Sequence, residues 1–203
     1  MNNLNKVILT DCDGVLLNWE WAFTIWMEQH GYGKQVVNPD SYDVSERYGI
    51  EKSKKRELVR YFNESAAMGF LPPLRDAMYY VDLLHRKHGY TFHMITSLTK
   101  DEHAQQLRIQ NTKKLFGETA FEKFIFEDTG ADKDAVLEPY RDSGLIWIED
   151  KLVNAQLGDR LGLESILVEH AHNMNNEEFP TFATWKDIYE YITDFLPRAS
   201  NLG

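Results

Sequence analysis

The chain has 203 residues, which is more than a typical single domain contains and fewer than two domains need. Apolar residues make up 43% of the chain and charged residues 27%, a balance that argues against disorder and fibrous repeats. The 22 Lys and Arg against 32 Asp and Glu give a net charge of -10. Extended binding to a nucleic acid polymer or to an anionic membrane is therefore not expected, whereas a small anionic substrate is compatible with a locally positive site.

The cysteine count and the hydropathy of the sequence indicate in which cellular compartment the protein is expected. A single cysteine, Cys12, excludes an internal disulfide framework and a cysteine-clustered metal site. The N-terminal residues lack a cationic leader, and no apolar run reaches the length of a membrane span. We expect a cytoplasmic protein, and the composition says nothing about its oligomeric state.

Short apolar runs predict buried strands. Helical patterns lie between the later runs, and such alternation favours a parallel sheet with helices on both faces, because each crossover packs back onto the sheet. We therefore predict an α/β fold with a Rossmann-like three-layer core. The expected strands are 6–10, 91–96, 123–126, 145–148 and 165–168.

The first gap between strands is unusually long. It spans roughly eighty residues, far more than one crossover helix requires. Apolar spacing predicts helices at 18–30 and 51–67 inside it. The sequence GFLPP at 69–73 ends this part, and a further helix at 74–88 leads into the second strand.

This gap predicts an insertion into the core. We expect a small helical cap at 18–73, inserted after the first strand of a core formed by 1–17 and 74–203. Apolar residues at helical spacing also predict a closing helix at 179–196 that packs on the core.

Ligands of open parallel sheets bind beyond the carboxyl ends of the strands, so the residues that follow the predicted strands form one candidate site. Asp11 and Asp13 follow the first strand, and Gly14 lets the chain turn directly after them. The later strands and loops add Thr96, Ser97, Lys133, Glu149 and Asp150. Carboxylates suit a hard divalent cation, whereas hydroxyl and ammonium groups suit phosphate oxygens, so the set predicts phosphate chemistry.

Four of these segments resemble, in order, the motifs of the haloacid dehalogenase superfamily. They are DCDGV at 11–15, Thr96 at the end of an apolar strand, Lys133, and IED at 148–150. The resemblance spans nearly the whole chain. Because the halide-displacing and ion-pumping relatives lack an aspartate at the position of Asp13, the resemblance implies a hydrolase of phosphate esters.

The resemblance also implies a role for each residue. Asp11 would be the nucleophile that forms an aspartyl-phosphate, and Asp13 would protonate the leaving oxygen and then activate water. Mg²⁺ would be the cofactor, held by Asp11, the backbone carbonyl of Asp13 and Asp150, with Glu149 nearby or acting through water. The phosphoryl group would be bound by Thr96, Ser97 and Lys133.

A closer likeness is to the 5′(3′)-deoxyribonucleotidases. It rests on DCDGVLLNWE at 11–20, together with the later motifs. In that family an aromatic ring at the position of Trp19 packs against the base, so the likeness implies a nucleoside monophosphate as substrate. The alternatives are a phosphatase or phosphotransferase acting on a small non-nucleotide phosphate ester, and a phosphate-binding regulator without turnover.

Each candidate also has a purely structural interpretation. Thr96 and Ser97 are suited to cap a helix, and Glu149 and Asp150 could do the same for the helix that follows them. The remaining alternatives are a surface position for Lys133, a core role in the cap for Trp19, Trp21, Phe23 and Trp26, a loop role for His170 and His172, and a solvated face formed by Lys52, Arg56 and Arg60.

Overall fold

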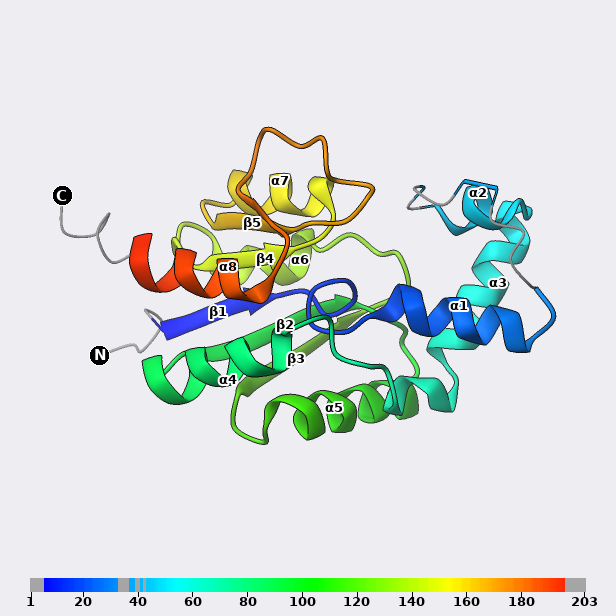
Figure 1. Ribbon diagram of the computed structural model, residues 1–203, viewed down its shortest axis with the longest axis horizontal. Helices are drawn as coiled ribbons and strands as arrows, with labels where there is room; N and C mark the ends of the chain where they lie inside the picture. The colour runs from blue at the N-terminus through cyan, green and yellow to red at the C-terminus, as the bar shows by residue number, and fades with distance from the viewer. Residues whose placement is uncertain (1–5, 33–36, 39–40, 42, 196–203) are drawn as a thin grey trace.

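The structure is a computed structural model, and it describes residues 6–32, 37–38, 41 and 43–195. Within these residues the core is a six-stranded sheet, in which every pair of neighbouring strands is parallel. Figure 1 shows strands β1 to β5 side by side in its centre. The strand order is β3-β2-β1-β4-β5-β6. The strands are β1 (Val7–Thr10), β2 (Thr91–Ser97), β3 (Phe121–Glu127), β4 (Ile146–Glu149), β5 (Glu164–Val168) and β6 (Thr181–Phe182).

Helices cover both faces of the sheet because successive strand residues point to opposite faces and are apolar on each. Ile8 of β1 packs in one buried cluster with α4 (Ala77–His88), α5 (Glu102–Phe116) and α8 (Trp185–Glu190). Leu9, its neighbour, packs in a second cluster with the helices of the opposite face, which are α6 (Asp134–Leu137) and α7 (Leu152–Arg160). The α/β fold class with a three-layer core is confirmed.

Three further helices lie beyond the carboxyl end of β1, on the right in Figure 1. They are α1 (Trp19–Gln29), α2 (Val44–Tyr48) and α3 (Lys52–Asn63), followed by a 3-10 turn at Ala66–Gly69. The chain leaves and re-enters the core at one place, because the N–H of Asn18 donates to Pro72 O at 2.9 Å and that of Leu74 to Leu16 O at 2.8 Å. The segment between these bonds is a single excursion from the core.

The C-terminal prediction is partly wrong. The closing helix was expected from 179, but Thr181–Phe182 forms the edge strand β6, and α8 begins at Trp185 after the Thr184 side chain caps it. A π-helical turn at Tyr191–Phe195 follows, and residue 196 lies outside the described residues. The short helix α2 and the first two residues of β3, Phe121 and Glu122, were also not predicted, since the exposed Glu122 interrupts the apolar run. None of the helices in the described part of the chain has both the length and the apolar character needed to cross a bilayer.

Candidate active site

The loop after β1 places Asp11 and Asp13 at the carboxyl edge of the sheet. The N–H of Asp11 still pairs with β4, donating to Ile148 O at 2.9 Å. The chain then turns sharply, since Cys12 O accepts the N–H groups of Leu16 and Leu17, each at 2.9 Å. Asp11 is buried on the floor of the site, and Asp13 lines the cavity above it.

Gly14 is required in this turn for two reasons. Its φ of 78° lies in the left-handed region that favours glycine. A Cβ at this position would also lie 2.5 Å from Asp150 Oδ2, closer than any stable contact. The absence of a side chain therefore lets the Asp11 loop lie directly against Asp150.

Lys133 lies between two carboxylates. Its Nζ is 3.0 Å from Asp11 Oδ1 and donates to Glu149 Oε1 at 2.6 Å, with the Trp147 ring centroid 5.0 Å away. Burial works against the charged form, but the charges of Asp11 and Glu149 outweigh it and raise the pKa of Lys133. Lys133 is therefore a buried cation at the floor of the site, and the surface interpretation is wrong.

Glu149 is fully engaged as an acceptor. Its Oε1 accepts from Lys133 and from Asn154 Nδ2 at 2.7 Å. Its Oε2 accepts the N–H groups of Asp150 and Lys151, each at 2.9 Å. Burial acts to raise the pKa of Glu149, but Lys133 and these donors outweigh it and lower the pKa. Glu149 thus holds Lys133 in place and binds the backbone just before α7, but it accepts no N–H of the first turn, so the capping interpretation of Glu149 is wrong.

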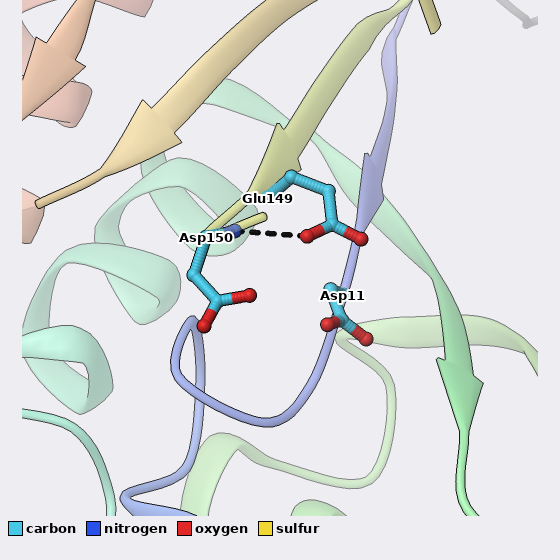
Figure 2. Close-up of side chains that lie close together, drawn as sticks. All are labelled: Asp11, Glu149 and Asp150. Atoms are coloured by element: carbon cyan, nitrogen blue, oxygen red, sulfur yellow. Dashed lines mark hydrogen bonds between the residues drawn. The ribbon is translucent and has the colours of Figure 1, made fainter. Parts of the chain in front are cut away.

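Three carboxylates meet at one point. Figure 2 shows Asp11, Glu149 and Asp150 around a common space, and one oxygen of each lies within 4.8 Å of the others. Burial, only partly offset by Lys133, raises the pKa of Asp11 from 3.8 to about 7, and burial with the charge of Glu149 raises that of Asp150. Asp11 Oδ1 is buried and, apart from its ion pair with Lys133, accepts no aligned hydrogen bond from the described residues.

This cluster fits a divalent cation. When all three carboxylates are ionised, they and the one ammonium leave an excess of two negative charges, which a hard divalent cation coordinated by oxygen would compensate. Asp11 and Asp150 have oxygens to offer it, whereas Glu149 already has four donors. The residues present therefore fit Mg²⁺ through Asp11 and Asp150.

Thr96 and Ser97 end β2 at the same edge and line the cavity. Ser97 Oγ donates to Ala131 O at 3.0 Å, which ties β2 to the loop that precedes Lys133. Neither caps α5, because the Asp101 side chain accepts the N–H of Ala104 at 2.7 Å and takes that role. The capping interpretation of Thr96 and Ser97 is wrong.

The site opens into a cavity of about 410 Å³ between the sheet edge and the helices α1 to α3. Its floor carries the acidic cluster, Lys133, Thr96 and Ser97. Its wall from the inserted helices combines aromatic and apolar side chains with two cations and the anion Glu20, which forms an ion pair with Arg47. That wall includes Trp19, Phe23, Val44, Arg47, Tyr48, Lys55, Val59 and Asn63.

Trp19 lies in the cavity wall within an aromatic cluster. Phe23 stacks on its ring at a centroid distance of 4.7 Å, and Phe62 meets it edge-on at 5.5 Å. The indole N–H donates to Asn63 Oδ1 at 2.9 Å, which fixes the ring orientation. Trp26 packs on the same cluster, whereas Trp21 is 55% exposed, so the core interpretation is wrong for Trp21.

Cys12 and the basic face of α3 lie outside the chemistry. Burial raises the pKa of the Cys12 thiol to about 12, so this side chain is a protonated filler. The basic face of α3, formed by Lys52, Arg56 and Arg60, is exposed and does not line the cavity, as expected for a solvated face.

His170 and His172 lie in the loop after β5, as predicted, and this loop forms part of the cavity wall. His170 Nε2 lies 2.6 Å from Gly14 O, and His172 Nε2 lies 2.9 Å from Asp150 O, so each ring donates to a carbonyl of the site. The rings stack at 5.5 Å, and burial lowers the pKa of both. They tie the segment after β5 to the loops that carry Asp13 and Asp150.

Sequence reasoning also missed Arg108. This side chain of α5 is fully buried, and its Nη1 lies 2.6 Å from Asp13 Oδ1. A signal was present, because Arg108 lies four residues from Ala104 and from Thr112, on the buried face of the helix. A charged residue on such a face needs a buried partner.

No protein-family model matches the sequence, and no curated protein is significantly similar to it. Solved structures are similar in fold. A haloacid dehalogenase-like hydrolase from Streptococcus pneumoniae superposes with a TM-score of 0.62 at 14% identity, over 92% of this chain and 98% of that one. A predicted phosphatase from Clostridium acetobutylicum gives 0.62 at 13% identity, over 92% and 97%.

A third structure is a haloacid dehalogenase family hydrolase from Deinococcus radiodurans with bound phosphate and sodium. It gives a TM-score of 0.59 at 14% identity, over 92% of this chain and 94% of that chain. The chain therefore has the haloacid dehalogenase-like α/β fold.

Proposed function

We propose that this protein is a magnesium-dependent phosphomonoester hydrolase that works through an aspartyl-phosphate on Asp11. The observation that carries the proposal is the group of Asp11, Lys133 and Asp150 at the carboxyl edge of the sheet, with Asp13 in the cavity above it. The fold supports it, because structures of this fold include hydrolases, and the one from Deinococcus radiodurans binds phosphate.

The chemistry begins with binding of the phosphoryl group. Lys133 provides a buried positive charge 3.0 Å from Asp11, and the Thr96 hydroxyl lies at the same edge. Mg²⁺, held by Asp11, Asp150 and the Asp13 carbonyl, would supply positive charge that offsets the repulsion between the attacking carboxylate and the phosphate. Glu149 does not act as a metal ligand in this proposal; it acts indirectly, by fixing the position of Lys133.

Phosphoryl transfer follows in two balanced steps. A carboxylate oxygen of Asp11 attacks phosphorus, the bond from phosphorus to the ester oxygen breaks, and Asp13 gives that oxygen its proton. Water then attacks phosphorus and gives a proton to Asp13, which releases inorganic phosphate and restores the Asp11 carboxylate. Two carboxylates thus have separate roles, as their different surroundings allow.

We infer that residues 18–73 form a cap that selects the substrate. The aromatic wall around Trp19 is suited to a flat ring, so a nucleoside monophosphate is the favoured substrate class. The deoxyribonucleotidase likeness supports this choice through the motif residues. A sugar phosphate or another small phosphate ester is the second candidate, because Arg47 and Lys55 add polar groups to the same wall.

The test is phosphate release from nucleoside monophosphates, sugar phosphates and an aryl phosphate, with magnesium and with chelator. Asp11→Asn is the inactive variant, and Asp128→Asn is the matched control, because Asp128 is an exposed acid that follows β3 outside the cavity. Magnesium-dependent release that Asp11→Asn abolishes and Asp128→Asn retains would support the mechanism. Release that persists in Asp11→Asn would refute it, and a preference for sugar phosphates would refute the nucleotide assignment.

A further inference from the structure

Arg108 is a buried cation beside Asp13 that the proposed chemistry leaves without a role. It belongs to α5, and its side chain is 0% exposed. Its Nη1 lies 2.6 Å from Asp13 Oδ1 and 3.1 Å from Cys12 Sγ, and its Nη2 lies 3.1 Å from Met68 Sδ. A guanidinium removed from water in this way needs a compensating negative charge.

Asp13 supplies that charge in its ionised form, which it takes after giving its proton to the leaving oxygen, and in its protonated form Oδ1 still accepts from Arg108 while Oδ2 carries the proton. The Cys12 thiol is protonated because burial raises its pKa to about 12, and the Met68 thioether is uncharged. Both sulfurs are weak acceptors, and Arg108 Nε has no partner among the described residues. Asp13 is therefore the strong interaction of Arg108.

The two side chains meet from opposite sides. Asp13 lines the cavity and its side chain is 22% exposed, whereas Arg108 is buried and is not among the described residues that line the cavity. The guanidinium thus approaches Asp13 from the core and engages Oδ1. The second carboxylate oxygen, Oδ2, is left for chemistry on the cavity side.

We propose that Arg108 is a positioning residue, which holds Asp13 Oδ1 on the core side so that Oδ2 exchanges the proton with the leaving oxygen and then with water. This inference rests on the proposed function. A general acid must lie within hydrogen-bond reach of the leaving oxygen, and an error of about 1 Å costs about 100-fold in rate. One short charged bond from a rigid helix restricts Asp13 in the required way.

Stability alone does not account for Arg108. Buried ion pairs contribute little to stability compared with apolar side chains of similar size. Arg108 Nε has no partner among the described residues, which costs stability. An apolar side chain would pack equally well against the two sulfur atoms that Arg108 contacts. Methionine fills a similar volume, so Arg108→Met removes the charge and the hydrogen bond while keeping most of the packing.

The test compares Arg108→Met, Arg108→Lys and a control. Thr112→Val is the matched control, because Thr112 lies one turn further along the same buried face and contacts Met94 and the backbone of α5 in place of Asp13. The substrates are an alkyl phosphate, whose leaving oxygen needs a proton, and an aryl phosphate, whose leaving oxygen does not. The parameter kcat/KM reports the steps up to alcohol release, and kcat also includes hydrolysis of the aspartyl-phosphate.

For Arg108→Met we expect kcat/KM to fall about 100-fold with the alkyl phosphate and less than about tenfold with the aryl phosphate. The kcat should fall for both substrates, because water activation also uses Asp13. Arg108→Lys should recover part of the loss, and Thr112→Val should behave as wild type. Equal losses for both substrates, or an equal loss in Thr112→Val, would overturn the proposal.

Crystal structures of wild type and Arg108→Met decide the same point without any activity. We expect the Asp13 carboxylate to leave its position or to occupy more than one conformer in the variant. An Asp13 carboxylate that keeps its position without Arg108 would overturn the proposal. If wild type released no phosphate from any ester, the proposed function would fail, and these structures would still show whether Arg108 positions Asp13.

Discussion

Lys133→Met is the substitution that most directly tests the electrostatics of the site. Lys133 Nζ lies 3.0 Å from Asp11 Oδ1, so a phosphoryl group under attack by Asp11 also lies close to this ammonium. Two unit charges about 4 Å apart at an effective dielectric constant of about 20 interact by about 4 kcal/mol. Loss of this attraction should lower kcat/KM by about 1000-fold.

The same substitution also removes the cation between Asp11 and Glu149, and breaking such a buried pair costs about 3–5 kcal/mol of stability. Activity is therefore measured well below the midpoint of thermal unfolding, and circular dichroism checks the fold. Lys100→Met is the matched control, because Lys100 makes an exposed ion pair with Glu127 at 2.9 Å and lies outside the cavity. A kcat/KM of Lys133→Met within about tenfold of wild type would refute the electrostatic reasoning.

Three further predictions concern Asp11, Asp13 and Trp19. Burial raises the pKa of Asp11 from 3.8 to about 7, so the folded protein retains a proton that the unfolded chain loses. With chelator present, we therefore expect the free energy of unfolding of wild type to fall by about 4 kcal/mol between about pH 4 and pH 7, relative to that of Asp11→Asn. Equal pH profiles of the two proteins in denaturant titrations would contradict this. Asp13→Asn leaves Arg108 as an unpaired buried charge and should lower Tm by about 6–20 °C. Adding Arg108→Met should restore Tm, whereas additive losses in thermal unfolding would argue against the pair. Trp19→Ala should raise KM for nucleoside monophosphates about tenfold and leave KM for a sugar phosphate unchanged. Equal changes of KM for both substrates in steady-state kinetics would show that Trp19 does not bind the base.

The sheet and the floor of the site could be predicted because both depend on local patterns. Buried parallel strands are continuous apolar runs, and β1 and β4 are read directly as such. In a parallel sheet the residues after each strand meet at one edge, so Asp11 and Asp150 were expected at the same edge. The pairing of β1 with β4 then brings them side by side.

The wall and the support of the site depend on packing that no local pattern encodes. Arg108 is 95 positions from Asp13, and their contact depends on how α5 is rotated against the sheet. His170 and His172 follow the end of β5 at Val168, so the rule that located Asp11 applied to them as well. Their partners are backbone carbonyls of loops distant in the sequence, and no spacing in the sequence indicates such contacts.

The C-terminal segment shows the limit of periodicity. The apolar spacing of Ile188 and Ile192 is real, and both are buried. The strand β6 has two residues, which is too short for any alternation to be visible before α8. It is recognised from its pairing with β5, where Leu167 lies opposite Thr181, and that pairing is a tertiary contact.

The identity of the nucleophile is the central claim, and direct trapping of the phosphoryl group tests it most directly. Wild type and Asp13→Asn are mixed with substrate and magnesium, quenched in acid and mapped by peptide mass spectrometry. The substrate is an aryl phosphate, whose leaving oxygen needs no proton from Asp13, so the intermediate still forms in Asp13→Asn and should accumulate because the residue that activates water is missing. The account predicts the mass of one phosphoryl group on Asp11 in the quenched samples and none in Asp11→Asn, whereas turnover with the phosphoryl group on another residue, or on none, would contradict it.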